Sequence, residues 1–180
     1  NGRLLRANQF AKKVNWATGI DMATGRPIDT PMTAEVRKTE EGKEPIEVWP
    51  SAFGGKNWMP MSFDPGRKLA FFNTINMGMK VRYAKQTRPG GPNWWLGLEL
   101  AGWAQPEDGN RGSLVAWDPV AQKQVWSAPH RYFWNGGVLA TAGGLVFQGA
   151  AEGDFSAYAS TDGKKLWTHQ AGTGIIAAPM

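Results

Sequence analysis

The chain has 180 residues, of which 42% are hydrophobic, and this composition provides enough apolar sequence for a sizeable core. The absence of cysteine excludes a disulfide framework and a thiolate metal site in this chain, and no apolar run approaches the roughly 18 residues of a membrane-spanning helix. The net charge of +5 is scattered among strands and loops without a standard nucleic-acid-binding motif, so we expect no nucleic-acid partner.

The residue content favours an all-β fold. Ten Trp, 23 Gly and 12 Pro are typical of short strands joined by tight turns, with aromatic side chains packed between sheets. Residues 1–5 resemble the second half of a hairpin, residues 14–17 predict a short strand, and residues 21–27 a turn. The polar, mixed-charge segment 29–48 predicts a loop excursion outside the core.

The middle of the chain alternates between clear and unclear patterns. Residues 69–74 predict a strand that follows the turn Asp64-Pro65-Gly66. Residues 76–113 are rich in Gly, Pro and Trp without clean alternation, and we interpret them as a second loop excursion that could border a substrate entrance. Four short strands are then predicted, separated by glycine-containing turns, over residues 138–141, 145–149, 155–159 and 165–167.

Two segments near the C-terminus repeat one pattern. Residues 116–126 and 157–167 each begin with Ala, continue through a polar turn that carries Lys, and end on Trp126 and Trp167. Their spacing of about 40 residues is that of a four-stranded propeller blade. Tryptophan at a fixed place in each repeat can dock one blade on the next, so we expect structural roles for both.

The repeat length bounds the architecture. At roughly 40 residues for each blade the chain holds about four blades of four-stranded antiparallel sheet, whereas closed propellers commonly have four to eight. The incomplete hairpin at 1–5 and an apolar strand at 174–180 with no following turn predict an internal fragment of a longer protein. We therefore interpret residues 1–180 as a single partial propeller domain.

Two motifs lie outside the repeat. Residues 54–62 hold paired glycines followed by Asn57 and Trp58, and residues 133–137 contain Trp134 at the start of the last blade. The innermost strand of a propeller blade lines the central channel, and Asn with Trp suits a flat ring with a polar rim. The residues alone leave open a purely structural role, in which the glycines form a turn and the tryptophans fill the core.

These two motifs, together with residues 141–149 and the Trp-terminated repeats, closely resemble the pyrroloquinoline-quinone (PQQ) dependent alcohol dehydrogenases, which are eight-bladed propellers with tryptophan-docking motifs. Within that family the chain is most similar to the type II quinohaemoprotein members. The resemblance runs end to end and implies about a third of the catalytic domain. It also implies that Asn57 and Trp58 lie at the edge of PQQ and that Trp134 borders it; Lys56 falls at a variable position and has no implied role.

The same resemblance implies an activity. A family member oxidises an alcohol to an aldehyde with PQQ and calcium, passes electrons to a cytochrome c domain or protein, and works in the bacterial periplasm. It implies that the catalytic Asp, the calcium ligands and an adjacent cysteine pair lie upstream of this chain. We therefore assign no catalytic and no metal-binding residue here, expect the fragment alone to be inactive, and leave open whether haem c is present in the full-length protein.

Two alternatives stay open. Non-enzymatic propeller scaffolds of the outer-membrane assembly type share the Trp-docked repeat and bind no quinone; residues 54–58 and Trp134 favour the enzyme over this class. A quinoprotein that acts on another substrate, such as a polymer or an alkaloid alcohol, is a closer competitor. The sequence does not identify the alcohol.

Overall fold

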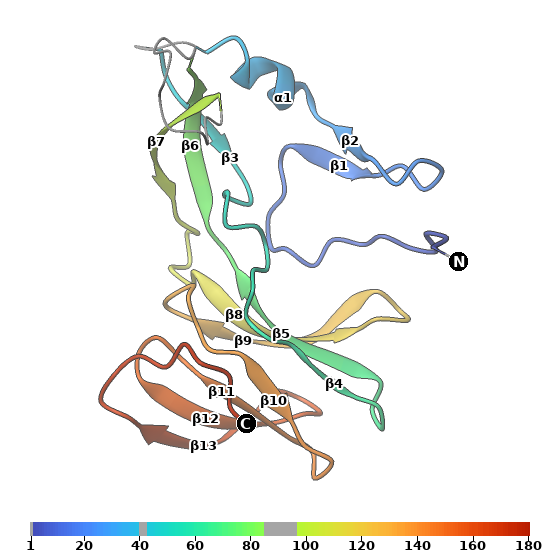
Figure 1. The fold of residues 1–180 in the computed structure, drawn as a ribbon, viewed down its shortest axis with the longest axis vertical. Coiled ribbons are helices and arrows are strands. Elements are labelled where there is room, and N and C mark those ends of the chain that lie inside the picture. Colours follow the sequence, from blue (N-terminus) through green and yellow to red (C-terminus); the bar gives the residue numbers. More distant parts are fainter. Residues whose placement is uncertain (1, 40–42, 85–96) are drawn as a thin grey trace.

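Figure 1 shows the computed structural model, which describes residues 2–39, 43–84 and 97–180 and consists almost entirely of β-strands. The elements assigned in these ranges are β1 (Ala17–Ile20), β2 (Pro27–Asp29), α1 (Pro31–Val36), β3 (Ile46–Val48), β4 (Ser62–Asp64), β5 (Leu69–Ile75), β6 (Gly78–Tyr83), β7 (Leu98–Ala104), β8 (Gly112–Asp118), β9 (Lys123–His130), β10 (Val138–Ala140), β11 (Leu145–Gly149), β12 (Asp154–Ala159) and β13 (Lys165–Gln170).

The strands of the described residues form four antiparallel sheets, which confirms the all-β class and the partial propeller. The order β4-β5-β8-β9 makes one four-stranded sheet, here called the first blade, and β10-β11-β12-β13 makes another, the second blade. The remaining sheets are smaller: β1 pairs with β2, and the third sheet has the order β3-β6-β7. The prediction of four-stranded sheets throughout therefore holds for two of these four sheets.

The second blade follows the predicted strands closely. Its four strands are consecutive in sequence and pair as a meander, because the turns between them contain Gly144, Gly153 and Gly163 at positive φ. The first blade departs from this simple order, since β6 and β7 are inserted between its second and third strands. In Figure 1 the two blades lie at one end of the molecule, and β6 leads from β5 toward the β3-β6-β7 sheet at the other end.

Both predicted loop excursions need correction. Segment 29–48 contains α1 and β3, and segment 76–113 contains β6, β7 and the start of β8. The clean alternation of the inserted hairpin is lost because its register shifts between Lys80 and Val81, so inward and outward positions change places there. The parts of these predictions that fall on 40–42 and 85–96 lie outside the described residues.

The predictions at the two ends also change. The strand expected over 14–17 lies at Ala17–Ile20, and the structure assigns no strand to 2–5 or 174–180. Residue patterns suited to a strand produce one only where a partner edge is available. In the last segment, for example, Ile175 donates a main-chain hydrogen bond to the Ala150 carbonyl, and no ladder of strand pairing is assigned to residues 174–180.

The core lies between the two blades. The inner face of the first blade contributes Leu69, Phe71 and Leu114, which pack with Val146 and Tyr158 of the second blade. The opposite face of the first blade packs Phe72 edge-on against Phe10 of the N-terminal segment, with ring centroids 5.6 Å apart. All seven residues of β5 are buried, which fits its central position in the sheet.

Trp126 docks the first blade on the second. Its buried indole donates a hydrogen bond from Nε1 to the Ser160 carbonyl at 2.9 Å and lies against Gly163. A Cβ at Gly163 would approach the indole to 2.5 Å, and the φ of +72° there also favours glycine. Trp167, the equivalent residue of the second repeat, is half-exposed on β13 and stacks on His169.

Candidate functional site

The two motifs outside the repeat meet in space. Trp58 follows the paired glycines between β3 and β4, and Trp134 lies in the connection from β9 to β10. Their ring centroids are 6.3 Å apart, with an interplanar angle of 29°. Trp58 is 62% exposed, so its indole offers an accessible aromatic surface beside Trp134. The structure thus brings together two of the three residues predicted for the site.

Other aromatic side chains extend this pair into a cluster. Phe53 stacks on Phe133 at 5.4 Å and on Trp103 of β7 at 4.9 Å, and it contacts Trp134 at 5.4 Å. We call these five residues, Phe53, Trp58, Trp103, Phe133 and Trp134, the aromatic cluster. Buried Met59, Ile75 and Met77 form the apolar layer against which Phe53, Phe133 and Trp134 pack. Ring pairs at these distances stabilise one another beyond the area that they bury.

Sequence reasoning assigned no site role to three members of this cluster, Phe53, Trp103 and Phe133, although Phe133 lies within the motif 133–137. Phe53 directly precedes Gly54, so its place beside the motif was a signal that could have identified it. Trp103 lies on the inserted hairpin, about 50 residues further along the chain, and no local pattern connects it with Phe53. Its contribution depends on how β6 and β7 leave the first blade.

Asn57, the third predicted residue, shapes the loop that carries Trp58. Its side-chain Nδ2 donates to the Phe53 carbonyl at 2.9 Å, and its Oδ1 accepts from the Trp58 main-chain N–H at 2.8 Å. The first bond closes a turn across four residues, and the second fixes the peptide that leads into Trp58. Asn57 therefore orients the exposed indole through local hydrogen bonds.

The loop requires glycine at positions 54 and 55 for two different structural reasons. Gly54 has a φ of +76°, a conformation that L side chains rarely adopt. Gly55 lies so close to the N-terminal segment that a Cβ would approach the side chain of Ala11 to 2.8 Å. The turn before Asn57 thus needs glycine at both positions, first for its backbone angle and then for space.

Lys56 adds a partly buried cation to this loop. Its Nζ donates to the carbonyls of Asn57 and Met59, at 3.1 Å and 3.0 Å. Burial lowers the pKa of Lys56 from its ordinary value of 10.5, because the charged ammonium loses hydration there. The loop therefore holds a positive charge within two residues of the aromatic surface.

The relatives described next align with nearly the whole of this chain. The quinohaemoprotein alcohol dehydrogenase ADH IIB of Pseudomonas putida is 40% identical over 193 residues, covering 100% of this chain and 25% of the relative. The 1-butanol dehydrogenase (cytochrome c) of Thauera butanivorans is also 40% identical, over 100% of this chain and 26% of the relative. Lupanine 17-hydroxylase [cytochrome c] of a Pseudomonas species is 36% identical, over 99% and 24%. No protein-family model matches the chain.

Solved structures agree with the sequences. The crystal structure of the quinohaemoprotein alcohol dehydrogenase from Comamonas testosteroni matches with a TM-score of 0.77 and 37% identity, over 94% of this chain and 25% of that one. The chain is homologous to the quinohaemoprotein alcohol dehydrogenases. A europium-containing methanol dehydrogenase matches with a TM-score of 0.80 and 30% identity, over 95% of this chain and 29% of that one.

The chain spans about a quarter of the length of the curated relatives it matches. Homology to quinohaemoprotein dehydrogenases therefore covers one part of a larger protein in each relative.

Among residues 2–39, 43–84 and 97–180, no group of three or more His, Cys, Asp or Glu side chains is placed to hold a metal ion. In the same ranges, no helix is long and apolar enough to cross a membrane.

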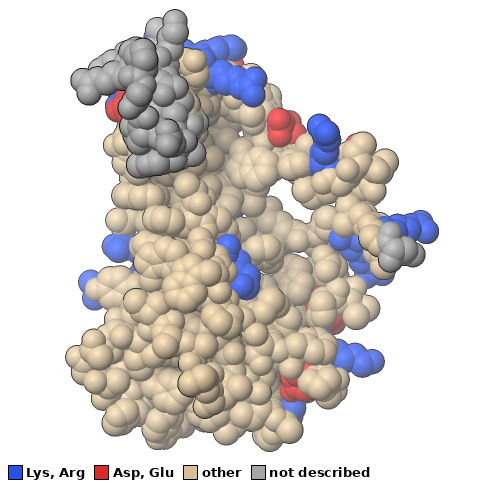
Figure 2. Space-filling view, in the orientation of Figure 1, with Lys and Arg blue, Asp and Glu red and all other residues tan. Residues whose placement is uncertain are grey.

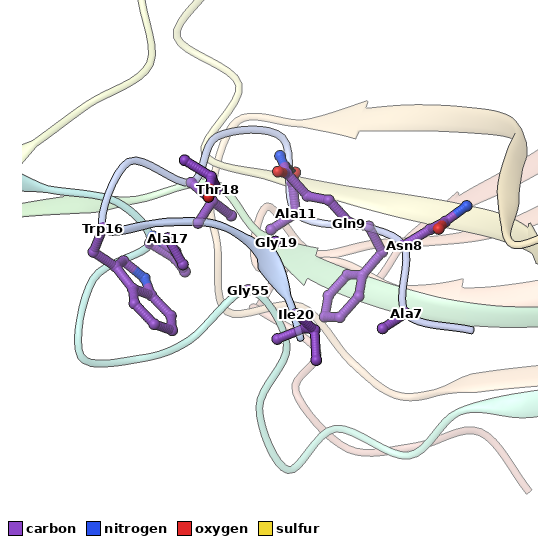
Figure 3. A pocket seen from close by; sticks show the side chains of 13 residues that line it. Ala7, Asn8, Gln9, Ala11, Trp16, Ala17, Thr18, Gly19, Ile20 and Gly55 are labelled. Carbon is purple, nitrogen blue, oxygen red and sulfur yellow. Dashed lines mark hydrogen bonds between the residues drawn. The ribbon is translucent and has the colours of Figure 1, made fainter. Parts of the chain in front are cut away.

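A cavity of about 440 Å³ lies beside the N-terminal segment and reaches Gly55, the second of the paired glycines (Figure 3). The N-terminal segment lines one side with Ala7, Asn8 and Gln9, and strand β1 with the residue before it lines another with Trp16 and Ile20. None of its lining residues is titratable, and Asn57, Trp58 and Trp134 are not among them. The cavity therefore offers an apolar space without acid or base groups, and the candidate site stays at the aromatic cluster.

On the face that Figure 2 shows, the charged side chains of the described residues are not concentrated at one place. On the face shown in Figure 2, Lys and Arg side chains are scattered over separate elements, and most of the surface carries neither sign. Ion pairs link some of these side chains to carboxylates, such as Arg67 to Asp64 at 2.8 Å and Arg82 to Glu99 at 3.3 Å. On this face the described charges therefore form no single patch of one sign.

Proposed function

We propose that this chain is part of a PQQ- and calcium-dependent quinoprotein dehydrogenase of the periplasm that oxidises alcohols to aldehydes and passes electrons to cytochrome c. The observation that carries the proposal is the meeting of Trp58 and Trp134. These residues come from two motifs that are 76 positions apart, and the fold joins them into one partly exposed aromatic surface. The homology to quinohaemoprotein alcohol dehydrogenases supports the same reading.

The residues present fit a planar quinone. Aromatic faces favour stacking with flat conjugated rings, and Trp58 exposes such a face while its neighbours remain packed against the apolar layer. The ammonium group of Lys56 lies on the same loop and suits an anionic cofactor such as PQQ. When bound, PQQ supplies an electron-poor ring that accepts the two electrons leaving the alcohol.

The roles of this chain's own residues follow from their contacts. Trp58 and Trp134 provide an apolar wall that excludes water from one side of the cofactor. Asn57 holds the loop so that the Trp58 indole keeps its place, because its carboxamide bonds the main chain on both sides. We assign the catalytic base and the calcium ligands to other parts of the proposed protein, so the chain alone is expected to be inactive.

Two substrate classes compete within this proposal. The relatives named 1-butanol dehydrogenase and lupanine 17-hydroxylase differ in substrate, and identity to this chain is 40% for the first and 36% for the second. Another relative named quinohaemoprotein alcohol dehydrogenase is also 36% identical, so identity does not separate the two substrate classes and the assay below decides between them. A non-enzymatic propeller scaffold would need the Trp126 docking contact alone, and it would leave the partly exposed aromatic cluster without a use.

The proposal is tested by reconstituting the full-length protein that carries this chain with PQQ and calcium. We expect one equivalent of PQQ to be retained and primary alcohols such as 1-butanol to reduce an artificial dye acceptor. Turnover of lupanine in place of 1-butanol would favour the alkaloid class. Failure to retain PQQ would leave the scaffold function.

The assignment of the site is tested by Asn57→Ala in the same protein. Loss of both local hydrogen bonds should let the Trp58 loop move, and we expect PQQ affinity to fall about tenfold, which corresponds to about 1.4 kcal/mol. Trp126→Phe is the matched control, since it alters a tryptophan contact between blades and leaves the candidate site intact. Equal PQQ retention by the two variants would contradict the assignment of Asn57.

A further inference from the structure

The connection that carries Trp134 is held by side-chain amides from two blades. Residues 131–137 join β9 to β10, and three of their main-chain carbonyls accept hydrogen bonds from carboxamide groups. The Tyr132 carbonyl accepts from Asn135 at 2.8 Å. The Phe133 carbonyl accepts from Asn73 of β5 at 3.3 Å, and the Gly136 carbonyl accepts from Gln148 of β11 at 3.1 Å. These three carbonyls lie on both sides of Trp134 in the sequence.

The same amides also bond to one another. Asn73 Oδ1 accepts from Asn135 Nδ2 at 3.3 Å and from Gln148 Nε2 at 3.4 Å. Gln148 Oε1 lies 2.9 Å from Nε2 of His130 at the end of β9. We call Asn73, His130, Asn135 and Gln148 the amide network. Asn73 and Asn135 are fully buried, Gln148 is 1% exposed and His130 is 8% exposed.

The network dictates the tautomer of His130. Both bonds from the Gln148 amide nitrogen go to oxygen atoms, so Gln148 Oε1 must be the acceptor that faces His130. The neutral imidazole therefore carries its hydrogen on Nε2 and donates it to Gln148. The chain of directed hydrogen bonds runs from His130 through Gln148 and Asn73 to the connection around Trp134.

Close packing leaves this connection little freedom. A Cβ at Gly112 would lie 2.6 Å from the Tyr132 carbonyl oxygen, and one at Gly136 would lie 2.7 Å from the Ala177 carbonyl oxygen. Asn135 Oδ1 also accepts from the main-chain N–H of Ala151 at 3.0 Å. Directional bonds and tight contacts together determine the backbone on both sides of Trp134. Apolar side chains could fill the same volume, but they would lack the directed contacts with these carbonyls.

We propose that the amide network is a positioning device that holds Trp134 against Trp58. Asn73, Asn135 and Gln148 bond the backbone that carries the indole, and His130 bonds Gln148. All four side chains are buried, and the bond between Gln148 and Asn73 joins β11 of the second blade to β5 of the first. The arrangement makes the geometry of the Trp pair depend on how the two blades meet. The consequence for PQQ rests on the proposed function, whereas the geometry of the Trp pair is measurable without the cofactor.

The test uses the full-length protein without PQQ. Two indoles at 6.3 Å interact through their electronic transitions, and the resulting far-ultraviolet circular dichroism couplet is isolated as the difference between the parent and its Trp58→Phe variant. Gln148→Met approximately keeps the volume of the side chain and removes the hydrogen bonds that the Gln148 carboxamide makes to His130, Asn73 and the Gly136 carbonyl. We expect it to lose at least half of the couplet and, once PQQ is added, to bind PQQ about tenfold more weakly.

Thr74→Val is the matched control. Thr74 neighbours Asn73 on β5, is 2% exposed and donates to the Ser113 carbonyl, so the variant also loses a buried hydrogen bond, one outside the network. We expect it to keep the full couplet. An unchanged couplet in folded Gln148→Met, or an equal loss in Thr74→Val, would overturn the proposal.

A second pair of variants gives a decision if Gln148→Met does not fold. His130→Gln retains an N–H donor near Gln148 Oε1, whereas His130→Phe removes it. We expect the first to retain the couplet and the second to reduce it, and equal couplets in the two would overturn the proposal. If the parent binds no PQQ, the proposed function fails, while the couplet still decides the role of the amide network.

Discussion

Individual tryptophans of this chain do different work according to their burial and contacts. Trp126 is 7% exposed and donates its indole N–H across the blade junction to Ser160. Trp58 is mostly exposed, and its ring contacts the ring of Trp134. The first arrangement stabilises the fold, because a large apolar side chain is buried and its polar atom is satisfied. The second leaves aromatic surface accessible for a ligand.

At this scale we predict that Trp126→Phe lowers the free energy of unfolding by about 1–3 kcal/mol, since it removes a hydrogen bond, leaves the Ser160 carbonyl unpaired and creates a small void. Urea unfolding of the parent and variant measures the difference. Trp58→Phe is the comparison, and its exposed position should make the loss smaller than about 1 kcal/mol. Similar losses in both variants would contradict the distinction.

A second residue-scale prediction concerns the left-handed position of the hairpin turns. This position has a φ of +57° at Lys68 and +56° at Gln122, and it is occupied by Gly163 in the last hairpin. Lys68→Gly should raise the free energy of unfolding by about 0.5–1 kcal/mol, because glycine adopts this angle without strain. In Gln122→Gly the gain should be smaller, since the side chain bonds Asn8 and Pro119. Urea unfolding of both variants ranks the effects.

At the scale of elements, local turn chemistry explains which strands the sequence predicts well. Asp21, Asp64 and Asp118 each accept two main-chain N–H bonds at the start of a hairpin turn, and this pattern marks the turn in the sequence itself. The hairpin of β6 and β7 escaped prediction because a register shift disturbs its alternation. Strand pairing across that shift depends on contacts distant in sequence.

The turn between β4 and β5 predicts a pH effect. A hydrogen bond from the Arg67 side chain, with further bonds from main-chain N–H groups, lowers the pKa of Asp64 below its usual 3.8. A lowered carboxyl pKa stabilises the folded state above pH 3.8, and this stability is lost as pH falls through the folded value. Asp64→Asn should therefore lower the thermal midpoint at neutral pH and have progressively less effect in acid. Thermal unfolding at pH 7, 5 and 3 measures this, and a constant difference would contradict the assignment.

At the scale of the whole molecule, the junction of the two blades combines apolar packing with a buried polar network. Phe71, Leu114 and Val146 exclude water there. The amide network adds directional hydrogen bonds across the junction. Burial lowers the pKa of His130, although the bond to Gln148 opposes that shift. Glu152 and Asp154 also raise this pKa, while Lys165 lowers it. Burial is the largest of these influences, so the imidazole prefers its neutral form in the folded protein.

The sign of the resulting pH dependence follows from proton binding. Below pH 6.5 the unfolded chain protonates His130 more readily than the folded protein does, so stability is present above 6.5 and lost as pH falls toward the folded pKa. His130→Gln should flatten the dependence of the thermal midpoint between pH 6.5 and 5. Equal slopes in the parent and His130→Gln would contradict this prediction.

The sequence by itself determined the all-β class, the docking role of Trp126 and the two motifs that contain Trp58 and Trp134. These features depend on local turns, on a repeated spacing and on motif residues, all of which are legible along the chain. Only the tertiary structure decided that Phe53 and Trp103 complete the aromatic cluster and that Asn73 and Gln148 hold the connection to Trp134. The reason is physical: stacking and buried hydrogen bonds join residues from different strands, and their partners are chosen by how the sheets pack.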